Sequence, residues 1–385
     1  MPSKRLALYE FFSGGGMARL GLGQRWECLF ANDFCEKKAR AYRSNFNGAP
    51  ELTVGDVGKL STDDLPGKPS LVWASFPCQD LSLAGNGAGL KGERSGTFWP
   101  FWRLMESLVL EGRGAPLIVL ENVVGAITSN GGRDFRAILQ AVSSVGYRVG
   151  ALVINAVHFV PQSRPRLFLL AVDSSIHLPS SLTTDAATVR WHPKALRAAQ
   201  EELPAKVRDS WVWWHLPVPS AVQGTLSDIV EAAPVGVEWH TPDETSRLLN
   251  LMSQANRRKV DQATRLGKRI VGTVYRRTRP NEAGKKVQRA EVRFDQISGC
   301  LRTPVGGSSR QTILVVHRDM IRSRLLSPRE AARLMGVPDT YKLPENYTEA
   351  YHLMGDGLAV PVVKWLEQHL LYSLAASTMD ASEAA

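Results

Sequence analysis

Cysteine is scarce in this chain: the 385 residues include four, Cys28, Cys35, Cys78 and Cys300. None belongs to a C-x-x-C pair or stands near a histidine at metal-ligand spacing, so a disulfide scaffold and a metal site are not expected. Long apolar runs are also lacking: no window of about 18 apolar residues occurs, and the opening segment MPSKRLALYEFF has a short one. These absences predict a soluble, cytoplasmic protein that does not span a membrane.

Positive charge is abundant, and it is concentrated in one segment. The formal net charge is +10, and residues 257–293 hold thirteen Lys and Arg against three Asp and Glu. Clustered cations favour a polyanion, because each neutralised phosphate releases condensed counterions. A solvated basic surface is the alternative. Val271, Val274 and Tyr275 within the segment favour strands over a disordered tail.

Apolar runs and helical patterns alternate along the first 172 residues. Helical patterns cover EKKARAYRSNF and DFRAILQAVSSV, and the apolar runs cover 6–12, 27–31, 70–76, 116–120, 147–154 and 166–172. Strands that are apolar almost throughout are typical of a parallel sheet covered on both faces. The sequence therefore predicts an α/β fold with a doubly wound, mostly parallel sheet, whose ligands gather at the carboxyl ends of the strands.

A glycine-rich turn, FSGGGMARLGLG, follows the first predicted strand. Gly14, Gly15 and Gly16 allow a tight turn and close approach of a ligand, and the following helix offers free N–H groups. Asp33, nineteen residues after Gly14, follows the second strand, where a carboxylate accepts hydrogen bonds from ribose hydroxyls. Asp56 in VGDVGKL is placed to meet an adenine amino group. These residues predict an adenosine-containing cofactor, although a purely structural turn would use the same glycines.

One cysteine ends an apolar run at the same predicted edge of the sheet. Cys78 stands between Pro77 and Gln79 and precedes a loop that contains Gly85, Gly87, Gly89, Gly92 and Gly96. A cysteine at a strand end under a movable loop is placed like a nucleophile. The alternative is a buried, unreactive cysteine, which is the commoner case for a single cysteine.

Two further motifs follow strands of the predicted sheet. PLIVLENVVGA supplies Glu121 and Asn122, and FVPQSRPRLFLLAV supplies Arg164 and Arg166, which share one face of an extended segment. Taken singly, the glutamate could cap a helix and the arginines could pair with surface acids. Together with Cys78 they predict one catalytic constellation.

In these residues the chain resembles the DNA (cytosine-5)-methyltransferases. The matching blocks occur in that family's order: EFFSGGGMARLGLG, ANDFCEKKARAY, GDV, SFPCQDLSLAG, RSGTFW, VLENV, VPQSRPRLFLLA, RFDQISGCLRTP and MGDGLAVPVV. The resemblance implies a Rossmann-like, S-adenosylmethionine-dependent catalytic and cofactor-binding domain over 1–172. It implies a smaller inserted target-recognition domain over 173–292, a return segment over 293–375 and a tail over 376–385.

The resemblance implies a covalent route to 5-methylcytosine. The Cys78 thiolate adds to carbon 6 of a cytosine, and carbon 5 then takes the methyl group of S-adenosylmethionine, which leaves S-adenosylhomocysteine. A protonated Glu121 hydrogen-bonds ring nitrogen 3, and Arg166 holds the base's carbonyl oxygen or Glu121. Arg164 stands near the DNA backbone and the thiolate, which positive charge favours. The cytosine has to flip out of the duplex, and loop 80–96 closes over it.

The same resemblance assigns contacts to the cofactor and to DNA. Phe12, Asp56 and Val57 are expected at the adenine, Asp33 at the ribose and Pro77 near the sulfonium. The complete expected cofactor set is Phe12, Ser13, Gly14, Gly15, Gly16, Met17, Asp33, Phe34, Asp56, Val57, Pro77 and Asp356. The expected DNA set is Gln79, Ser82, Lys91, Arg276, Arg277 and Arg279, with Ser82 and Lys91 on phosphates.

One block departs from the family pattern. Gly355 and Asp356 stand where the family usually has glycine and asparagine, so an acid replaces a neutral amide close to the expected cofactor site. The contact of Asp356 is therefore an open question. The other blocks are intact, and we expect the activity to be retained.

Three other interpretations use part of the same evidence from the residues. A relative that acts on tRNA shares the cysteine and the glutamate, but the basic insertion favours DNA. A nicotinamide oxidoreductase uses a glycine turn and an acid such as Asp33, but has no need of Cys78, Glu121 and Arg166 together. A DNA-binding regulator with an inactive site would bind without turnover. The expected partners are double-stranded DNA and, where one exists, a companion restriction endonuclease; the expected state is a monomer in a bacterial or phage-infected cell.

The segment SPREAARLMGVP near the end predicts a capped helix. Ser327 is the N-cap, Pro328 takes the first helical position and Glu330 completes a capping box. The tryptophan-rich segment WVWWH, residues 211–215, is expected in the core of the smaller domain.

Overall fold

The computed structural model describes residues 5–77, 90, 95–220, 224–280, 284–303 and 309–383. The chain forms two compact units. The large unit comprises Met1–Asn155, Pro165–Val218 and Val362–Ala385, and the small unit comprises Ala156–Arg164 and Pro219–Pro361. The predicted target-recognition segment, 173–292, is thus divided between the units after Val218, and its role stays a prediction.

The large unit is built on a seven-stranded sheet with the order β3-β2-β1-β4-β5-β7-β6. Strand β7 runs antiparallel to both of its neighbours, and the other pairs are parallel. The strands are β1 Leu6–Phe11, β2 Trp26–Asp33, β3 Leu52–Val54, β4 Leu71–Ala74, β5 Leu117–Val123, β6 Tyr147–Asn155 and β7 Pro165–Asp173. The prediction of a mostly parallel α/β sheet is confirmed, and every predicted apolar run lies in this sheet. β3 was not predicted, because three residues are too few to show a period.

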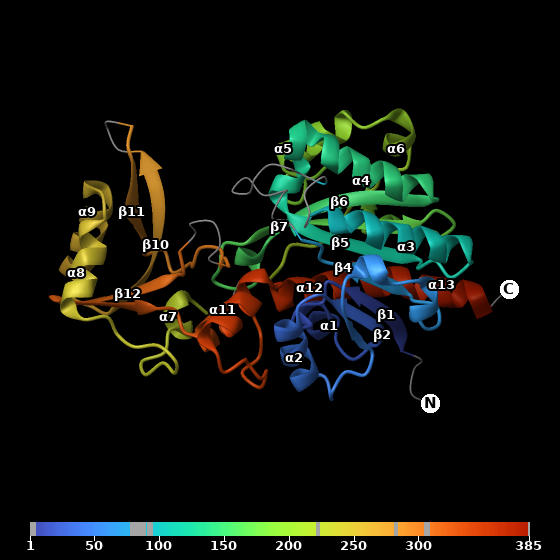
Figure 1. Cartoon of the computed structure of the whole chain (residues 1–385). Helices are drawn as coiled ribbons and strands as arrows, with labels where there is room; N and C mark the ends of the chain where they lie inside the picture. Colours follow the sequence, from blue (N-terminus) through green and yellow to red (C-terminus); the bar gives the residue numbers. More distant parts are fainter. Residues whose placement is uncertain are drawn as a thin grey trace. The chain divides into compact units, whose positions relative to one another are not determined.

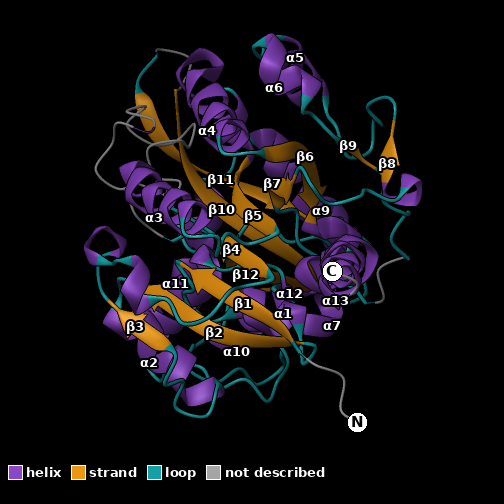
Figure 2. Ribbon diagram, turned by 90° about the vertical axis from the view of Figure 1, so that its right-hand side faces the viewer, coloured by secondary structure: helices purple, strands orange, loops and turns teal. Residues whose placement is uncertain are grey.

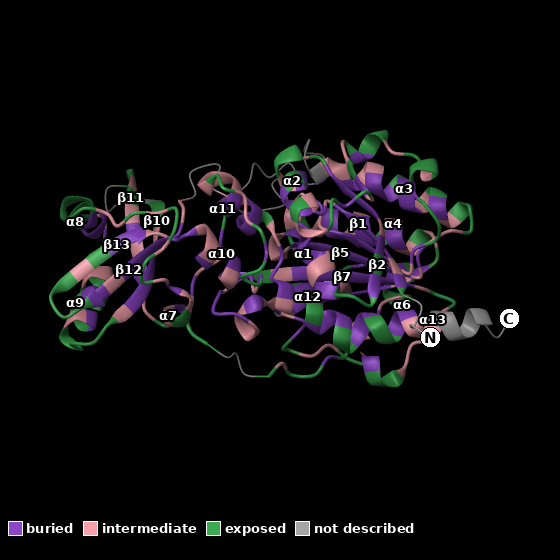
Figure 3. Cartoon of the chain, turned by 90° about the horizontal axis from the view of Figure 1, so that it is seen from below, coloured by how far each residue is buried: buried purple, intermediate pink, exposed green. Residues whose placement is uncertain are grey.

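Helices cover both faces of the sheet, which explains why the strands are apolar throughout. Figure 2 shows α3 and α4 on one face and α1, α2 and α13 on the other. Figure 3 shows the strands of this sheet as buried along most of their length. The helices are α1 Met17–Leu22, α2 Glu36–Asn45, α3 Phe98–Leu110, α4 Arg133–Ser144, α5 Lys194–Glu201, α6 Ala205–Asp209 and α13 Tyr372–Glu383, which a π-helical turn, Glu367–Leu371, precedes. The carboxyl ends of the parallel strands lie at one edge of the sheet, and the polar loops that follow them gather there.

The tryptophan-rich segment belongs to the large unit, so its predicted place in the smaller domain's core is wrong. Trp213–Trp214 forms β9, which pairs with β8, Thr183–Thr184. The carbonyl oxygen of Val212 and the ring of Trp214 pack so closely on Gly150 of β6 that no side chain fits there. Aromatic content alone does not tell which of two cores a segment joins.

The small unit carries a four-stranded antiparallel sheet with the order β11-β10-β12-β13 (Figure 1). Its strands are β10 Ile270–Pro280, β11 Lys286–Arg293, β12 Thr312–His317 and β13 Met320–Leu325. Its helices are α7 Leu226–Ile229, α8 Pro242–Asn250, α9 Gln254–Arg265, α10 Pro328–Leu334 and α11 Tyr347–Asp356, while α12, Val360–Leu366, crosses the boundary between the units. Helices α8 and α9 bury Leu248, Val260 and Ala263 against Val274 and Val316 of the sheet. The strands expected around Val271, Val274 and Tyr275 are confirmed, as one long strand.

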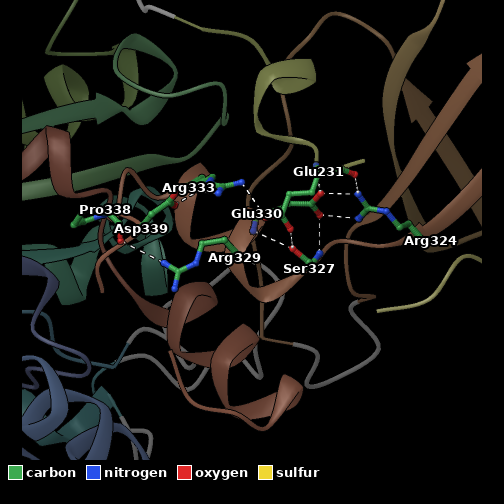
Figure 4. Close-up of polar contacts among 8 residues, drawn as sticks. All are labelled: Glu231, Arg324, Ser327, Arg329, Glu330, Arg333, Pro338 and Asp339. Carbon is green, nitrogen blue, oxygen red and sulfur yellow. Dashed lines mark hydrogen bonds and ion pairs between the residues drawn. The ribbon is translucent and has the colours of Figure 1, made fainter. Parts of the chain in front are cut away.

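A buried ion pair joins β13 to α10 in the small unit (Figure 4). The guanidinium of Arg324 donates two hydrogen bonds, of 2.6 and 2.7 Å, to the two carboxylate oxygens of Glu330, and both side chains are fully buried. The N–H of Ser327 donates to the same carboxylate at 2.8 Å, which confirms the predicted capping box. The Arg324 guanidinium also donates to the Glu231 carbonyl at 2.9 Å. Bidentate geometry and extra hydrogen bonds are what make a buried ion pair tolerable.

Within the described residues, no helix is long and apolar enough to cross a membrane. No group of three or more His, Cys, Asp or Glu among them could hold a metal ion.

Candidate active site

The predicted glycine turn follows β1 and lies in left-handed backbone. Gly14 and Gly16 have φ of +57° and +76°, and Phe12 before them has φ of +56°. A Cβ on Gly14 would meet no atom within 4 Å, whereas one on Gly16 would lie 2.3 Å from the Phe46 ring. The turn is therefore closed on the side of Gly16 and open beside Gly14, where a ligand can reach the backbone.

Asp33 ends β2 directly beside this turn. The N–H of Gly14 donates to Asp33 Oδ2 at 2.7 Å, and the N–H of Cys35 donates to Oδ1 at 2.8 Å. Each carboxylate oxygen has a second acceptor position, so Asp33 can still accept hydrogen bonds from two hydroxyls. Phe34, the next residue, has a ring that is 79% exposed. An acid fixed by backbone amides next to an exposed ring suits a ribose and a flat base.

Ser13 and Asp56 complete this side of the sheet edge. The hydroxyl oxygen of Ser13 is buried and has no hydrogen-bond partner among the described atoms. Asp56 is exposed, and its Oδ1 accepts from the N–H of Gly58 at 2.8 Å, which caps the 3₁₀ turn Val57–Lys59. Val57 is buried under it. Buried Met17 begins helix α1 after the turn.

A charged network that the sequence analysis did not predict lies beneath the glycine turn. Glu10, the last residue but one of β1, is 1% exposed, and its carboxyl accepts from Tyr42 Oη at 3.0 Å and from the N–H of Arg19 at 3.3 Å. Burial raises the pKa of Glu10 to about 7, against the opposing effect of these hydrogen bonds. The Arg19 guanidinium pairs with Glu51 and lies 4.4 Å from the centre of the Phe46 ring that supports Gly16. The signal for this network was an acid inside the apolar run LALYEFF.

Asn122 links the ends of two strands. These are β4, which precedes Cys78 in the sequence, and β5, which contains Glu121. The two strands are parallel neighbours, with Ala74 paired to Leu120. The buried Asn122 amide donates to the carbonyl of Phe76 at 3.1 Å, and its Oδ1 accepts from the N–H of Val123 at 2.9 Å. Phe76 stands two residues before Cys78. The sequence placed Asn122 at this edge but gave it no role.

Glu121 and Arg166 meet across β5 and β7. The antiparallel register places Arg166 opposite Val123, and Arg166 Nε lies 3.2 Å from Glu121 Oε1. Their side chains are 10% and 16% exposed, for Glu121 and Arg166 respectively. The carboxyl is thus held by a guanidinium at the edge of the sheet and keeps access to solvent.

Arg164, another predicted catalytic residue, is bound to several backbone carbonyl oxygens. Its guanidinium donates to the carbonyl oxygens of Leu301 at 2.9 Å, Gly355 at 2.8 Å and Gly357 at 2.7 Å, all within the small unit. The side chain is 2% exposed. Gln162 supports the same segment, because its Oε1 accepts from the N–H of Leu301 at 3.1 Å. Arg164 therefore has a structural function, and its predicted part in catalysis stays a prediction.

Asp356 ends α11, and one oxygen of its carboxylate accepts a hydrogen bond from the Thr303 hydroxyl. The amide oxygen of an asparagine could accept the same bond, so the family's usual residue and this one can make this contact equally well. Asp356 is exposed.

Several predicted residues are not described. Cys78, Gln79, Ser82 and Lys91 lie outside the described residues, as does the side chain of Arg279. Pro77, the last described residue before them, is partly buried. Arg276 and Arg277 are exposed on β10 of the small unit.

The sheet order and the residues at its edge define the fold of an S-adenosylmethionine-dependent methyltransferase. The carboxyl group of Glu121 lies near the end of β5. The profile of the C-5 cytosine-specific DNA methylases matches residues 6–371. The chain belongs to this family, and its activity is that of a DNA (cytosine-5)-methyltransferase.

Individual relatives agree with this assignment. The Type II methyltransferase M.NgoBI of Neisseria gonorrhoeae is 32% identical over 92% of this chain and 90% of its own length. The Type II methyltransferase M.Bsp6I of a Bacillus species is 24% identical over 96% of this chain and 99% of its own. Among solved structures, a Spodoptera frugiperda DNMT2 mutant is similar, with a TM-score of 0.62, 15% identity and coverage of 95% of this chain and 99% of that one. The structural likeness concerns the fold alone.

The cofactor that this family generally uses, S-adenosylmethionine, fits the residues of the glycine turn. The buried hydroxyl of Ser13 lacks a partner among the described atoms, the space beside Gly14 is open, and Asp33 has acceptor capacity to spare. The cofactor presents ribose hydroxyls as donors to Asp33, a flat ring as a stacking partner for Phe34, and a polar methionine part that suits Ser13 and the space beside Gly14.

Proposed function

We propose that the enzyme methylates a cytosine within a specific sequence of double-stranded DNA through a covalent adduct of Cys78. The observation that carries the proposal is the bond from Asn122 to the Phe76 carbonyl, at 3.1 Å, beside the pair of Glu121 and Arg166. Phe76 stands two residues before Cys78 in the sequence, which supports the proposal that Cys78 acts at this edge.

The proposed roles follow from the chemistry of cytosine, whose carbon 5 is a weak nucleophile. The Cys78 thiolate adds to carbon 6, and electron density moves to carbon 5 and ring nitrogen 3. Glu121 hydrogen-bonds nitrogen 3 and stabilises the negative charge that develops there, while Arg166 orients Glu121 and can reach the base's carbonyl oxygen. S-adenosylmethionine, when bound, supplies an electrophilic methyl group. A base then takes the proton from carbon 5, the bond between carbon 6 and sulfur breaks, and the Cys78 thiolate leaves as the ring is restored.

The cofactor is proposed to lie along the carboxyl ends of β1 to β4. Asp33 would accept the ribose hydroxyls, and the ring of Phe34 would stack on the adenine, with Asp56 at the adenine amino group. Ser13 and the turn Gly14–Gly16 would hold the methionine part. Phe12, Met17, Val57, Pro77 and Asp356 are proposed as further contacts.

The remaining proposals concern DNA. The cytosine would have to leave the stack, at a cost of about a few kcal/mol, because neither a thiolate nor Glu121 can reach it inside a duplex. Segment 80–96, with Ser82 and Lys91, and Gln79 would contact the DNA around it. Segment 173–292 would recognise the target. Because the relatives are Type II methyltransferases, a companion restriction endonuclease is proposed, and a monomer in the bacterial cytoplasm is the proposed working state.

The test is sequencing of 5-methylcytosine in a bacterium that lacks cytosine methylation and expresses the wild type, Cys78→Ala or Cys35→Ala. We expect one short motif to be methylated by the wild type and by Cys35→Ala, and no methylation by Cys78→Ala. Methylation by Cys78→Ala would remove the proposed nucleophile.

A second experiment tests the covalent step separately. Fluorine in place of hydrogen at carbon 5 leaves no proton to be lost, so an adduct to Cys78 cannot resolve. We expect a duplex with 5-fluorocytosine at the target to give a complex that survives denaturing electrophoresis with the wild type, and none with Cys78→Ala. A complex that dissociates in the wild type would contradict covalent catalysis.

A further inference from the structure

The outer half of the hairpin β10–β11 is a two-stranded ribbon. β10 pairs with β12 through Ile270–Val274 only, while it pairs with β11 from Thr273 to Pro280. Figure 1 shows β10 and β11 extending together away from β12. The ribbon therefore consists of 275–280 and 286–291, and among the described residues no third strand pairs with it. From 275 to 291 the sequence holds six Lys and Arg against two Glu.

The two faces of this ribbon differ, because side chains alternate along a strand and paired residues share a face. One face continues the core: Val274 is paired with Val292, and Arg276 with Ala290, which is buried. The other face carries Tyr275, Arg277, Arg289 and Glu291, and we call it the arginine face.

Arg277 and Arg289 are directly opposite each other on the arginine face. Like charges in this position are destabilising unless an anion lies near them. Glu291 forms an ion pair with Arg277, whose Nε lies 3.3 Å from Glu291 Oε2. Among the described residues Arg289 has no ion-pair partner. The fold thus maintains two cations side by side, and Glu291 pairs with one of them, Arg277.

The arginine face is also firmly supported. The Arg277 guanidinium lies 5.7 Å from the centre of the Tyr275 ring, and the Tyr275 hydroxyl donates to the Cys300 carbonyl at 2.8 Å. A side chain on Gly299 would come within 2.3 Å of the Tyr275 ring, so the ring lies directly against the backbone. Arg277 is therefore held in place before any DNA arrives, which lowers the entropy lost on binding.

We propose that this ribbon enters the major groove of the target DNA and that Arg277 and Arg289 each recognise a guanine there. The inference rests on the proposed function. The major groove is about 12 Å wide and admits a two-stranded ribbon. An arginine fork matches the O6 and N7 acceptors of guanine, whereas a phosphate contact carries no sequence information. Arg276, on the other face, is assigned to the DNA backbone.

The first experiment compares the methylated motifs of Arg289→Ala, Arg289→Lys, Arg277→Ala and wild type in the bacterium without cytosine methylation. Each arginine substitution on the arginine face should relax the motif at one G·C pair, with a loss of discrimination of about 10- to 100-fold. Lysine keeps the charge but not the fork, so Arg289→Lys should relax the same position. The control is Arg265→Ala, an exposed cation at the end of α9, which should leave the motif unchanged. Thermal unfolding of each variant checks that it is folded.

The second experiment removes the acceptor from DNA instead of the donor from the protein. A duplex of the recognised sequence carries 7-deazaguanine, which lacks the N7 acceptor, at the relaxed position. The wild type should methylate it about 10- to 100-fold more slowly than the normal duplex, and Arg289→Ala should show no difference between the two duplexes.

The outcomes separate the alternatives. A uniform loss of methylation with an unchanged motif, together with a smaller salt dependence, would mean that the arginines contact phosphates and would overturn the inference. Full activity and an unchanged motif in all variants would overturn it as well. A wild type that binds DNA but leaves it unmethylated would contradict the proposed function, and the ribbon could then be tested by binding alone.

Discussion

The two sheets of the molecule place their charged residues in different ways. In the seven-stranded sheet both faces are covered, and Asp33 and Glu121 stand at or near strand ends. In the four-stranded sheet the ribbon carries Arg277, Arg289 and Glu291 along one face, partly exposed. A parallel sheet has no free face for solvated charge, while an antiparallel one does.

Under the proposed function, this difference separates catalysis from recognition. A strand end fixes a side chain between neighbouring strands, as β5 and β7 fix Glu121 beside Arg166. A ribbon face presents several side chains to a long ligand, and each of them contributes a part of the binding. Substitution of a residue at a strand end should therefore abolish a catalytic step. Substitution of a residue on the ribbon should change the preferred DNA sequence.

The largest effect is expected from Glu121→Gln. The amide keeps the shape but cannot transfer a proton to nitrogen 3 as a protonated carboxyl can, so kcat should fall by about 10²- to 10⁴-fold. Transfer of a radioactive methyl group from S-adenosylmethionine to DNA measures it. The control is Glu111→Gln, an exposed residue paired with Arg113 at 3.1 Å, which should keep the wild-type rate. Equal rates for both variants would contradict a catalytic role of Glu121.

The pair of Arg324 and Glu330 in the small unit is buried, unlike the charges of the ribbon, and it should behave like a buried group. Glu330→Ala leaves the fully buried Arg324 guanidinium without its carboxylate. The free energy of unfolding should fall by about 3–5 kcal/mol, measured by urea denaturation and circular dichroism. Arg43→Ala, which breaks the exposed pair with Glu36, should lower it by less than about 1 kcal/mol. Similar losses in the two variants would mean that burial does not set the strength of these pairs.

Glu10, the acid inside the large sheet, should make stability depend on pH. Its pKa is about 7 in the folded protein and 4.5 ordinarily. Between these values the unfolded chain loses a proton that the folded chain keeps, so stability falls as the pH rises and levels off above about 7. Across this pH range the free energy of unfolding should fall by about 3 kcal/mol.

Glu10→Gln cannot titrate and should lack this decline. The measurement is urea unfolding of the wild type and of Glu10→Gln at about pH 5 and about pH 8, with Glu36→Gln as the exposed control. A parallel pH dependence in the wild type and in Glu10→Gln would assign the effect to another group.

Arg277→Ala should barely affect stability, because its ion pair with Glu291 is more than one-third exposed on both sides. We expect a change in the free energy of unfolding of less than about 0.5 kcal/mol. A loss of several times that size would show that the arginine face stabilises the fold, and its assignment to DNA would lose its main support.

Asp356→Asn should have the smallest effect. The asparagine oxygen can still accept from the Thr303 hydroxyl, so stability should change by less than about 0.5 kcal/mol, and the KM for S-adenosylmethionine should stay near that of the wild type. Asp356→Ala, which removes the acceptor, is the comparison. A large rise in KM for Asp356→Asn alone would show that the negative charge itself contacts the cofactor.

Much of the large unit was predictable from local patterns. The apolar runs identified six strands, because a strand buried on both faces has no polar interruption. In the small unit, the capping box at Ser327 is local as well, since its two residues, Ser327 and Glu330, are three positions apart. Glu10 shows the limit: its position in an apolar run was visible, but its partners Tyr42 and Arg19 come from other elements.

The sequence supplied the candidate residues of the site but not all of their contacts. The order of the motifs identified Glu121, Arg166 and Asp33 as candidates, and their roles stay predictions. The contacts of Arg164 with three backbone carbonyls were not foreseen, because no sequence pattern marks a carbonyl as an acceptor. Neither was the role of Asn122, whose acceptor is a backbone atom of another strand.

The sequence by itself determined the candidate site residues, the strands that support them and a helix cap, because these depend on local period and on residue type. The tertiary structure alone decided which of them meet. Strand order brings Arg166 to Glu121, and strand register puts Arg277 opposite Arg289 while Arg276, the next residue, faces the other way. Such choices depend on how distant segments pair, and a shift of one residue in register would reverse every face.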